Sequence, residues 1–314
     1  MPIPSQFAGR LAVPAIAAPM FLVSGPDLVV ETCKAGVIGT FPALNQRSSA
    51  GFEAWVAEIA GRLDRHEADT GVRPAPFGVN LIVRKTNLRL QADLDIVVKW
   101  RVPLVITSLG AAREVVEAVH AYGGQVFHDV VNRRHAEKAA EAGVDGIIAV
   151  CAGAGGHAGT LSPFALAGEI REFFGGTLVL AGGIGNGRQI AAAGMMGADL
   201  AYLGTRFIAT RESLAPDAYK QMLCRATAND IVYTPYISGL PASFLRQSLI
   251  DVGLDADAPD RSGTAEDRKA LAWKTVWSAG QGVGNISDIP SAADLCARLA
   301  AEYREAVRTA ADFA

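Results

Sequence analysis

The amino-acid sequence predicts an α/β fold in which eight parallel strands, each followed by a helix, close into a barrel. Eight short apolar runs rich in Val, Ile and Leu recur along the first two thirds of the chain. They lack strict alternation, which is typical of strands buried on both faces. Segments with helical periodicity separate these runs. A doubly wound open sheet is the alternative, but the count of eight and the absence of a G-x-G-x-x-G motif after the first run favour the (β/α)8 TIM barrel.

The expected strands occupy defined segments, and the helices between them follow from apolar spacing. Phe52, Trp55, Val56, Ile59 and Leu63 recur on one helix face. A closing helix begins after Ser291, where leucines again share one face. We place the eight strands at 11–20, 37–43, 77–82, 104–109, 125–130, 146–151, 177–183 and 200–206.

The regular alternation stops near residue 210. We expect residues 1–210 to form the barrel and 211–275 to form an insertion of about 60 residues after strand 8. We predict that this insertion is mostly helix and loop, with a polar stretch at 251–270. We expect it to cover the substrate at the barrel mouth. Residues 276–314 then return to the barrel with an active-site loop and the last helix.

Length, charge and cysteine spacing exclude several classes of protein. The chain has 314 residues and a net charge of −3, so no nucleic-acid or anionic-membrane partner is indicated. It has no apolar run of the roughly 18 residues that a membrane span needs. The four cysteines are too widely spaced for a metal site or a disulfide framework. We therefore expect a cytoplasmic protein without a metal ion.

A glycine-rich loop follows the sixth expected strand and carries one histidine. Residues 153–159 contain four glycines around His157. Glycines at a strand end permit positive φ angles and close approach of the backbone to a ligand. A histidine there suits proton transfer or the orientation of an anionic substrate. Since a lone histidine is more often structural, its place in this loop is what makes His157 a catalytic candidate.

Two further glycine loops follow the seventh and eighth strands, at 181–187 and 204–206. Loops at these two positions form the phosphate site of many barrels, although tight barrel closure is the alternative explanation. The ligand would be a phosphorylated substrate or a cofactor such as FMN. Small residues before Met20 leave room for a flat ligand, and Asn80 ends the third strand. His128 and Asp129 end the fifth, and we expect His128 to face the barrel mouth.

Several of these segments together resemble one family. AAPM, FGVN, AGAGGHAG, LAGGIGNG, YLGTRF, ISGLPAS and WSAGQGVG are similar to motifs of the nitronate monooxygenases, formerly called 2-nitropropane dioxygenases. The resemblance runs over nearly the whole chain. It implies a TIM barrel that binds FMN non-covalently, with His157 as the active-site histidine. It also implies that the cofactor contacts are Met20, Asn80, Gly155, Gly156, Gly182, Gly183, Gly204, Thr205, Gln281 and Gly282.

One position departs from the family pattern. Many relatives carry a lysine after the fifth strand, beside the flavin, whereas this chain has His128 at or near that place. The resemblance therefore implies that His128 contacts the cofactor. A neutral imidazole would stabilise an anionic reduced flavin less than an ammonium group would. The departure is therefore expected to affect which substrate the protein binds and which electron donor it accepts.

The resemblance implies FMN-dependent oxidation of alkyl nitronates by O2 to carbonyl compounds and nitrite. His157 would orient the nitronate or abstract the α-proton of a nitroalkane. A homodimer is compatible with this assignment. The alternative within the superfamily is an NAD(P)H-dependent flavin reductase acting on quinones or enoyl thioesters. Two further alternatives are a flavin-free barrel that binds a phosphorylated sugar or nucleotide, and a non-catalytic FMN-binding protein.

Overall fold

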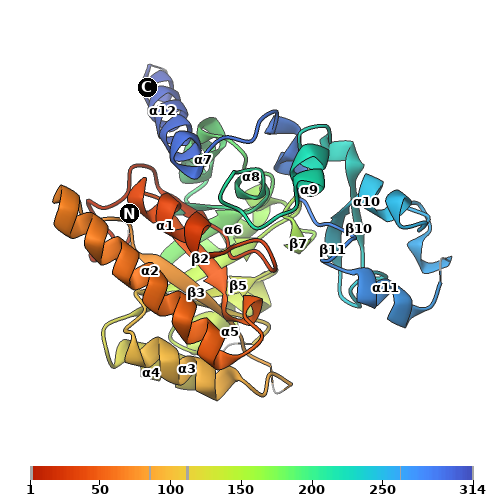
Figure 1. Cartoon of the computed structure of the whole chain (residues 1–314). Helices are drawn as coiled ribbons and strands as arrows, with labels where there is room; N and C mark the ends of the chain where they lie inside the picture. The colour runs from red at the N-terminus through yellow and green to blue at the C-terminus, as the bar shows by residue number, and fades with distance from the viewer. Residues whose placement is uncertain (1–2, 85, 111–112, 262, 313–314) are drawn as a thin grey trace.

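A computed structural model describes residues 3–84, 86–110, 113–261 and 263–312. At its centre is a closed barrel of eight parallel strands (Figure 1). Each strand lies within one of the apolar runs, so the predicted barrel is confirmed and the open sheet is excluded. In ring order the strands are β1 (Ala15–Ala17), β2 (Ile38–Pro42), β3 (Phe77–Ile82), β4 (Leu104–Ser108), β5 (Gln125–Val130), β6 (Gly146–Val150), β8 (Thr177–Ala181) and β9 (Leu200–Leu203).

Helices surround the barrel and bury the faces that the sequence spacing predicts. On the second helix, Phe52, Val56, Ile59 and Leu63 are all buried, and Trp55 is half-buried. In the described part of the chain, no helix has both the length and the apolar character needed to cross a bilayer. The helices are α1 (Pro26–Lys34), α2 (Ser49–Thr70), α3 (Leu90–Lys99), α4 (Arg113–His120), α5 (Arg133–Glu141), α6 (Pro163–Arg171), α7 (Gly187–Met195), α8 (Thr205–Ile208), α9 (Asp217–Leu223), α10 (Arg246–Asp251), α11 (Ala265–Leu271) and α12 (Ala292–Ala311).

Alternate residues of each barrel strand fill the interior. Ile16, Ile38, Ile106 and Phe127 belong to one buried cluster inside the barrel. Phe7, from the segment before β1, joins this cluster and meets Phe127 edge-on at 6.5 Å between ring centroids. Since side chains of a strand alternate between its two faces, the neighbours of these residues face the surrounding helices. This register decides which polar side chains at the strand ends point inward.

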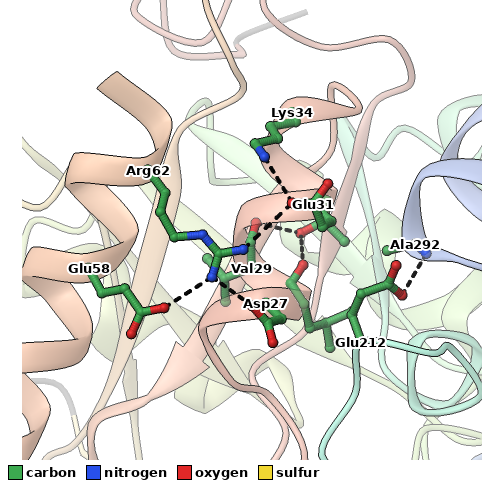
Figure 2. Close-up of polar contacts among 10 residues, drawn as sticks. Asp27, Val29, Glu31, Lys34, Glu58, Arg62, Glu212 and Ala292 are labelled. Atoms are coloured by element: carbon green, nitrogen blue, oxygen red, sulfur yellow. Dashed lines mark hydrogen bonds and ion pairs between the residues drawn. The ribbon is translucent and has the colours of Figure 1, made fainter. Parts of the chain in front are cut away.

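An ion-pair network ties α1 to α2 on the outside of the barrel (Figure 2). Arg62 of α2 lies 2.6 Å from Asp27 of α1 and 3.0 Å from Glu58 on its own helix. Glu31 pairs with Lys34 at 2.9 Å. These carboxylates are partly or largely exposed, so the pairs stabilise the fold only modestly. The network is structural, since none of its residues lines the cavity described below.

The segment after the barrel contains two strands, although the sequence pattern predicts mostly helix and loop for residues 211–275. β10 (Ile231–Thr234) and β11 (Ala242–Leu245) pair antiparallel, and β11 also pairs with β7 (Gly156–His157). Figure 1 places this sheet, with α10 and α11, to one side of the barrel. The strands are short and are separated by a segment that holds Pro235 and Pro241, and the β7 partner of β11 lies far away in sequence. Local pattern therefore could not reveal the pairing.

We predict that Phe7→Ala destabilises the protein, because the substitution leaves a void beside Phe127 in the barrel interior. The expected loss is about 3–5 kcal/mol in the free energy of unfolding, measured by urea denaturation. Phe164→Ala is the control, since that side chain is 78% exposed and its loss should change stability by less than about 0.5 kcal/mol. Equal effects of the two substitutions would contradict a role for Phe7 in the core.

Candidate functional site

A cavity of about 1440 Å³ lies at the carboxyl ends of the barrel strands. Residues at or after the end of every barrel strand line it, and Tyr219, Trp273 and Ser278 from the later part of the chain complete the wall. The cavity therefore lies where catalytic residues of such barrels gather. It brings together eleven of the twelve sequence-predicted site residues: Met20, Asn80, His128, Gly155, Gly156, His157, Gly182, Gly183, Gly204, Thr205 and Gly282.

Gln281 is the predicted residue that the cavity does not include. Its side chain is exposed, and its backbone N–H donates to the Gly153 carbonyl at 2.8 Å. The neighbouring Gly280 and Gly282 do line the wall. The structure thus places the 280–282 turn at the site through its backbone.

The glycine loops pack backbone against backbone. The Gly153 carbonyl accepts from Gly183 N–H at 3.2 Å as well as from Gln281 N–H. Gly280 N–H donates to Thr205 Oγ1 at 2.9 Å. A Cβ atom at Gly155 would lie 2.9 Å from Gly280 N, closer than side-chain carbons come to other atoms. Only glycine permits this approach, so the loops form one continuous wall of peptide groups.

The wall leaves open space at Gly183. Its φ is +71°, and a Cβ there would meet no described atom within 4 Å, although the residue lines the cavity. At Gly204, the nearest atoms to such a Cβ are in Ala18 and Met20, at 3.8 Å. A methyl group would enter the space that a ligand can use. Peptide groups with room in front of them suit an anionic group such as phosphate.

His157 is held by the sheet that extends from the insertion. It pairs with Ala242 of β11, and its ring meets the edge of Trp273 at 5.3 Å between centroids. The side chain keeps an exposed part toward the cavity. Desolvation by the surrounding protein, and then the positive charge of Arg84, lower the pKa of His157 below its ordinary value. The imidazole is therefore neutral at pH 7 and can accept a proton.

Trp273 and a group of cations are site residues that sequence reasoning missed. Trp273 has φ +69°, the left-handed region that side chains other than glycine seldom adopt. This backbone turns its ring toward His157, and no motif marks it. The cations at the cavity wall are Arg84, Arg113 and Lys138. Arg84 follows β3, whereas Arg113 and Lys138 belong to α4 and α5, so only the fold gathers them into a surface that attracts anions.

A chain of hydrogen bonds crosses the ends of β3, β4 and β5. Asn80 Nδ2 donates to the Ile106 carbonyl at 3.2 Å and to Ser108 Oγ at 2.7 Å. Ser108 Oγ donates to Asp129 Oδ2 at 2.5 Å. Burial raises the pKa of Asp129 to about 6, although the bond from Ser108 lowers it. Tyr202, which also lines the cavity, has its pKa raised by burial and by the nearby Asp129.

His128 and Asp129 face opposite sides of β5. Phe127 points into the barrel, so Asp129 shares its inward phase, whereas His128 shares the phase of Val126 and Val130. We expected His128 to face the mouth; it lines the cavity edge, but Asp129 takes the inward position. His128 Nδ1 lies 2.7 Å from Thr107 Oγ1. Desolvation, with a contribution from His135, lowers the pKa of His128 to about 4, so its ring is neutral.

Comparison with known proteins gives one family match. Residues 8–302 match the family model described as nitronate monooxygenase. A nitronate monooxygenase of Pseudomonas aeruginosa is 29% identical over 343 aligned residues, which cover 93% of this chain and 96% of that protein. The solved structure of a nitroalkane oxidase from Streptomyces ansochromogenes is similar with a TM-score of 0.80 at 28% identity, over 98% of this chain and 99% of that one.

A further relative carries a different activity in its name. It is a (3aS,4S,5R,7aS)-5-hydroxy-7a-methyl-1-oxo-octahydro-1H-indene-4-carboxyl-CoA dehydrogenase from Rhodococcus jostii. It is 27% identical over 263 residues, which cover 84% of this chain and 70% of that protein. Both kinds of relative are oxidoreductases, but their names give different substrates. The similarity therefore identifies an oxidoreductase family and does not identify the substrate.

The neutral state of His128 predicts a loss of stability in acid. Its pKa is lower in the folded protein than the ordinary 6.5, so the stabilisation is present above pH 6.5 and is lost as the pH falls toward 4. From pH 7.5 to 4.5, the wild type should lose about 2–3 kcal/mol more unfolding free energy than His128→Asn. Urea denaturation at the two pH values measures this difference. Parallel losses in both proteins would contradict a buried neutral His128.

Proposed function

Because this chain belongs to the nitronate monooxygenase family, an oxidoreductase family, we propose that it binds FMN and uses O2 to oxidise alkyl nitronates. The products would be a carbonyl compound and nitrite. The observation that carries the proposal is the position of His157. Its neutral imidazole faces a cavity whose wall is made of glycine peptide groups and whose rim is cationic. This arrangement suits a phosphorylated cofactor and a small anionic substrate.

The described residues fit FMN. The peptide groups around Gly183 and Gly204 offer the open, backbone-lined space that a phosphate requires, and Gly182 lines the same cavity. Asn80 and the apolar side chain of Met20 line the same cavity, where a flat heterocycle would rest. When bound, FMN would supply the electron transfer to O2 that amino-acid side chains cannot perform. The protein would hold the cofactor and orient the substrate.

A nitronate is an anion, and the cavity wall carries cationic side chains that suit it. Arg84, Arg113 and Lys138 would attract it to the mouth. His157 would then orient its oxygens, and with a neutral nitroalkane the same imidazole would remove the α-proton. Trp273 fixes the ring by its edge contact. The lowered pKa of His157 keeps the base form available at neutral pH.

A second candidate is an NAD(P)H-dependent flavin reductase acting on enoyl thioesters or quinones. The similarity to a carboxyl-CoA dehydrogenase supports it, and the same cations would accept the phosphates of a thioester carrier. The two functions differ in the electron donor. Under anaerobic conditions, bleaching of the flavin absorbance by NADH or NADPH but not by an alkyl nitronate would favour the reductase.

We predict that Gly183→Ala weakens FMN binding, because its methyl group would project into the space for the phosphate. The loss in affinity, measured by quenching of FMN fluorescence, should be at least about tenfold. Gly71→Ala is a matched control: its φ is +68°, and a Cβ there also meets no described atom within 4 Å. Both variants should lose about 1 kcal/mol of stability from backbone strain. Equal FMN affinity in the two variants would contradict the phosphate position.

The role of His157 as a base makes a separate prediction. His157→Ala should reduce kcat/KM for a neutral nitroalkane by about 10²–10⁴, but should affect the pre-formed nitronate by less than about tenfold. Oxygen consumption and nitrite release measure both rates. His120→Ala, at the exposed end of α4, should leave both unchanged. A similar loss on both substrates would rule out proton abstraction by His157.

A further inference from the structure

Asp129 is the polar group of the cavity that the proposed function leaves unused. Its Oδ2 accepts from Ser108, whereas its Oδ1 is fully buried and has no hydrogen-bond partner among the described residues. The residue lines the cavity and shares the inward phase of Phe127. An unpaired carboxylate oxygen in such surroundings costs free energy. Because Asp129 lines the cavity, a ligand bound there would supply the partner that this oxygen lacks.

The hydrogen bonds around Asp129 determine which of its oxygens can carry a proton. The Ile106 carbonyl can only accept, so it fixes the NH2 group of Asn80 toward β4. Ser108 Oγ then accepts from Asn80 and must direct its own hydrogen to Asp129 Oδ2. A protonated Asp129 therefore holds its hydrogen on Oδ1. The same chain leaves Asn80 Oδ1 as an acceptor.

Barrel closure places this chain opposite the phosphate position. β3, β4 and β5 take the third to fifth places in the ring of eight, and β8 and β9 take the seventh and eighth. A ligand with its phosphate at β8 and β9 that crosses the mouth brings its far end toward β3–β5. The polar edge of a flavin carries an N–H between two carbonyl oxygens. Asn80 Oδ1 matches the N–H, and a donor on Asp129 Oδ1 matches a carbonyl.

We propose that Asp129 binds the cofactor in its protonated form, with the hydrogen on Oδ1 donated to a carbonyl oxygen of the flavin ring. The inference rests on the proposed function, because it assumes that FMN is the ligand. An ionised Asp129 would instead place a negative charge against that carbonyl. Since burial raises the pKa of Asp129 to about 6, much of the free protein must take up a proton as it binds the cofactor at neutral pH.

Other groups that titrate or carry charge face the cavity and must be separated from Asp129. His128 is on the same strand but points to its other side, and Tyr202 ionises only at high pH. The FMN phosphate itself has a pKa near 6. The remaining charged or titratable lining residues in the described part of the chain are Arg84, Arg113, His135, Lys138, Glu141, His157 and Tyr219. The wild type and a variant that changes Asp129 alone share all of these groups, so the ratio of their Kd values cancels the contributions of these groups.

Asp129→Asn is that variant, because its amide reproduces the protonated acid. The amide oxygen can accept from Ser108 while the NH2 group donates where Oδ1–H would. The experiment measures the Kd of FMN from pH 5.5 to 8 by fluorescence quenching of the flavin-free full chain. The ratio of the wild-type Kd to the Asp129→Asn Kd should rise at least about tenfold over this range, since only about 1% of a group with a pKa of 6 is protonated at pH 8.

Asp95→Asn is the matched control, because it removes one exposed carboxylate from α3 that is not among the residues lining the cavity. Its Kd should follow the wild-type value at every pH. A constant ratio between wild type and Asp129→Asn would overturn the proposal while leaving the FMN assignment intact. Failure of the wild type to bind FMN at any pH would overturn the proposed function and this inference together.

Proton uptake by the wild type provides a measurement that needs no variant. Calorimetric titration of FMN at pH 7.5, in two buffers of different ionisation enthalpy, should detect uptake approaching one proton per FMN bound. The phosphate of FMN is already a dianion at this pH and contributes little. Binding without proton uptake would overturn the role of Asp129 even if Asp129→Asn failed to fold.

Discussion

Direct contact between the backbones of the glycine loops is the constraint on which the mouth of this barrel depends. Gly153 accepts hydrogen bonds from both the β8 loop and the 280–282 turn. A Cβ at Gly280 would lie 2.5 Å from the Gly153 carbonyl oxygen, so a side chain there would push the loops apart. The wall that results is made of peptide groups. Chemical specificity is therefore left to the few side chains that project past it.

Burial sets the charge of two side chains near this wall. His128 and Asp129 are adjacent, and desolvation drives both toward the neutral form, lowering one pKa and raising the other. The imidazole of His128 is therefore neutral at pH 7, whereas Asp129, with a pKa of about 6, loses its charge only when it takes up a proton. The positive charges of Arg84, Arg113 and Lys138 stay at the wall nearer solvent. Such a division attracts an anion to the mouth without placing a fixed cation beneath it.

The segment after the barrel does more than supply Tyr219 and Trp273 to the cavity wall. Its strand β11 pairs with β7, so the backbone of His157 is part of a small sheet rather than a free loop. Trp273, from beyond α11, contacts the His157 ring edge-on. Gly156 N–H donates to Ser278 Oγ, from the segment that returns to the barrel. Three distant parts of the chain thereby orient one imidazole, which an isolated glycine-rich loop could not do.

The barrel was predictable from the amino-acid sequence, because local apolar spacing indicates eight buried strands and amphipathic helices such as α2. Glycine clusters at strand ends also indicated the loops around Gly155, Gly183 and Gly204, since glycine is needed where two backbones approach without room for a side chain. The three-dimensional fold was needed to establish which residue of the His128–Asp129 pair faces inward, because strand phase depends on the packing of residues such as Phe127. It also decided the β11–β7 pairing and the place of Trp273, which depend on contacts between residues far apart in the chain.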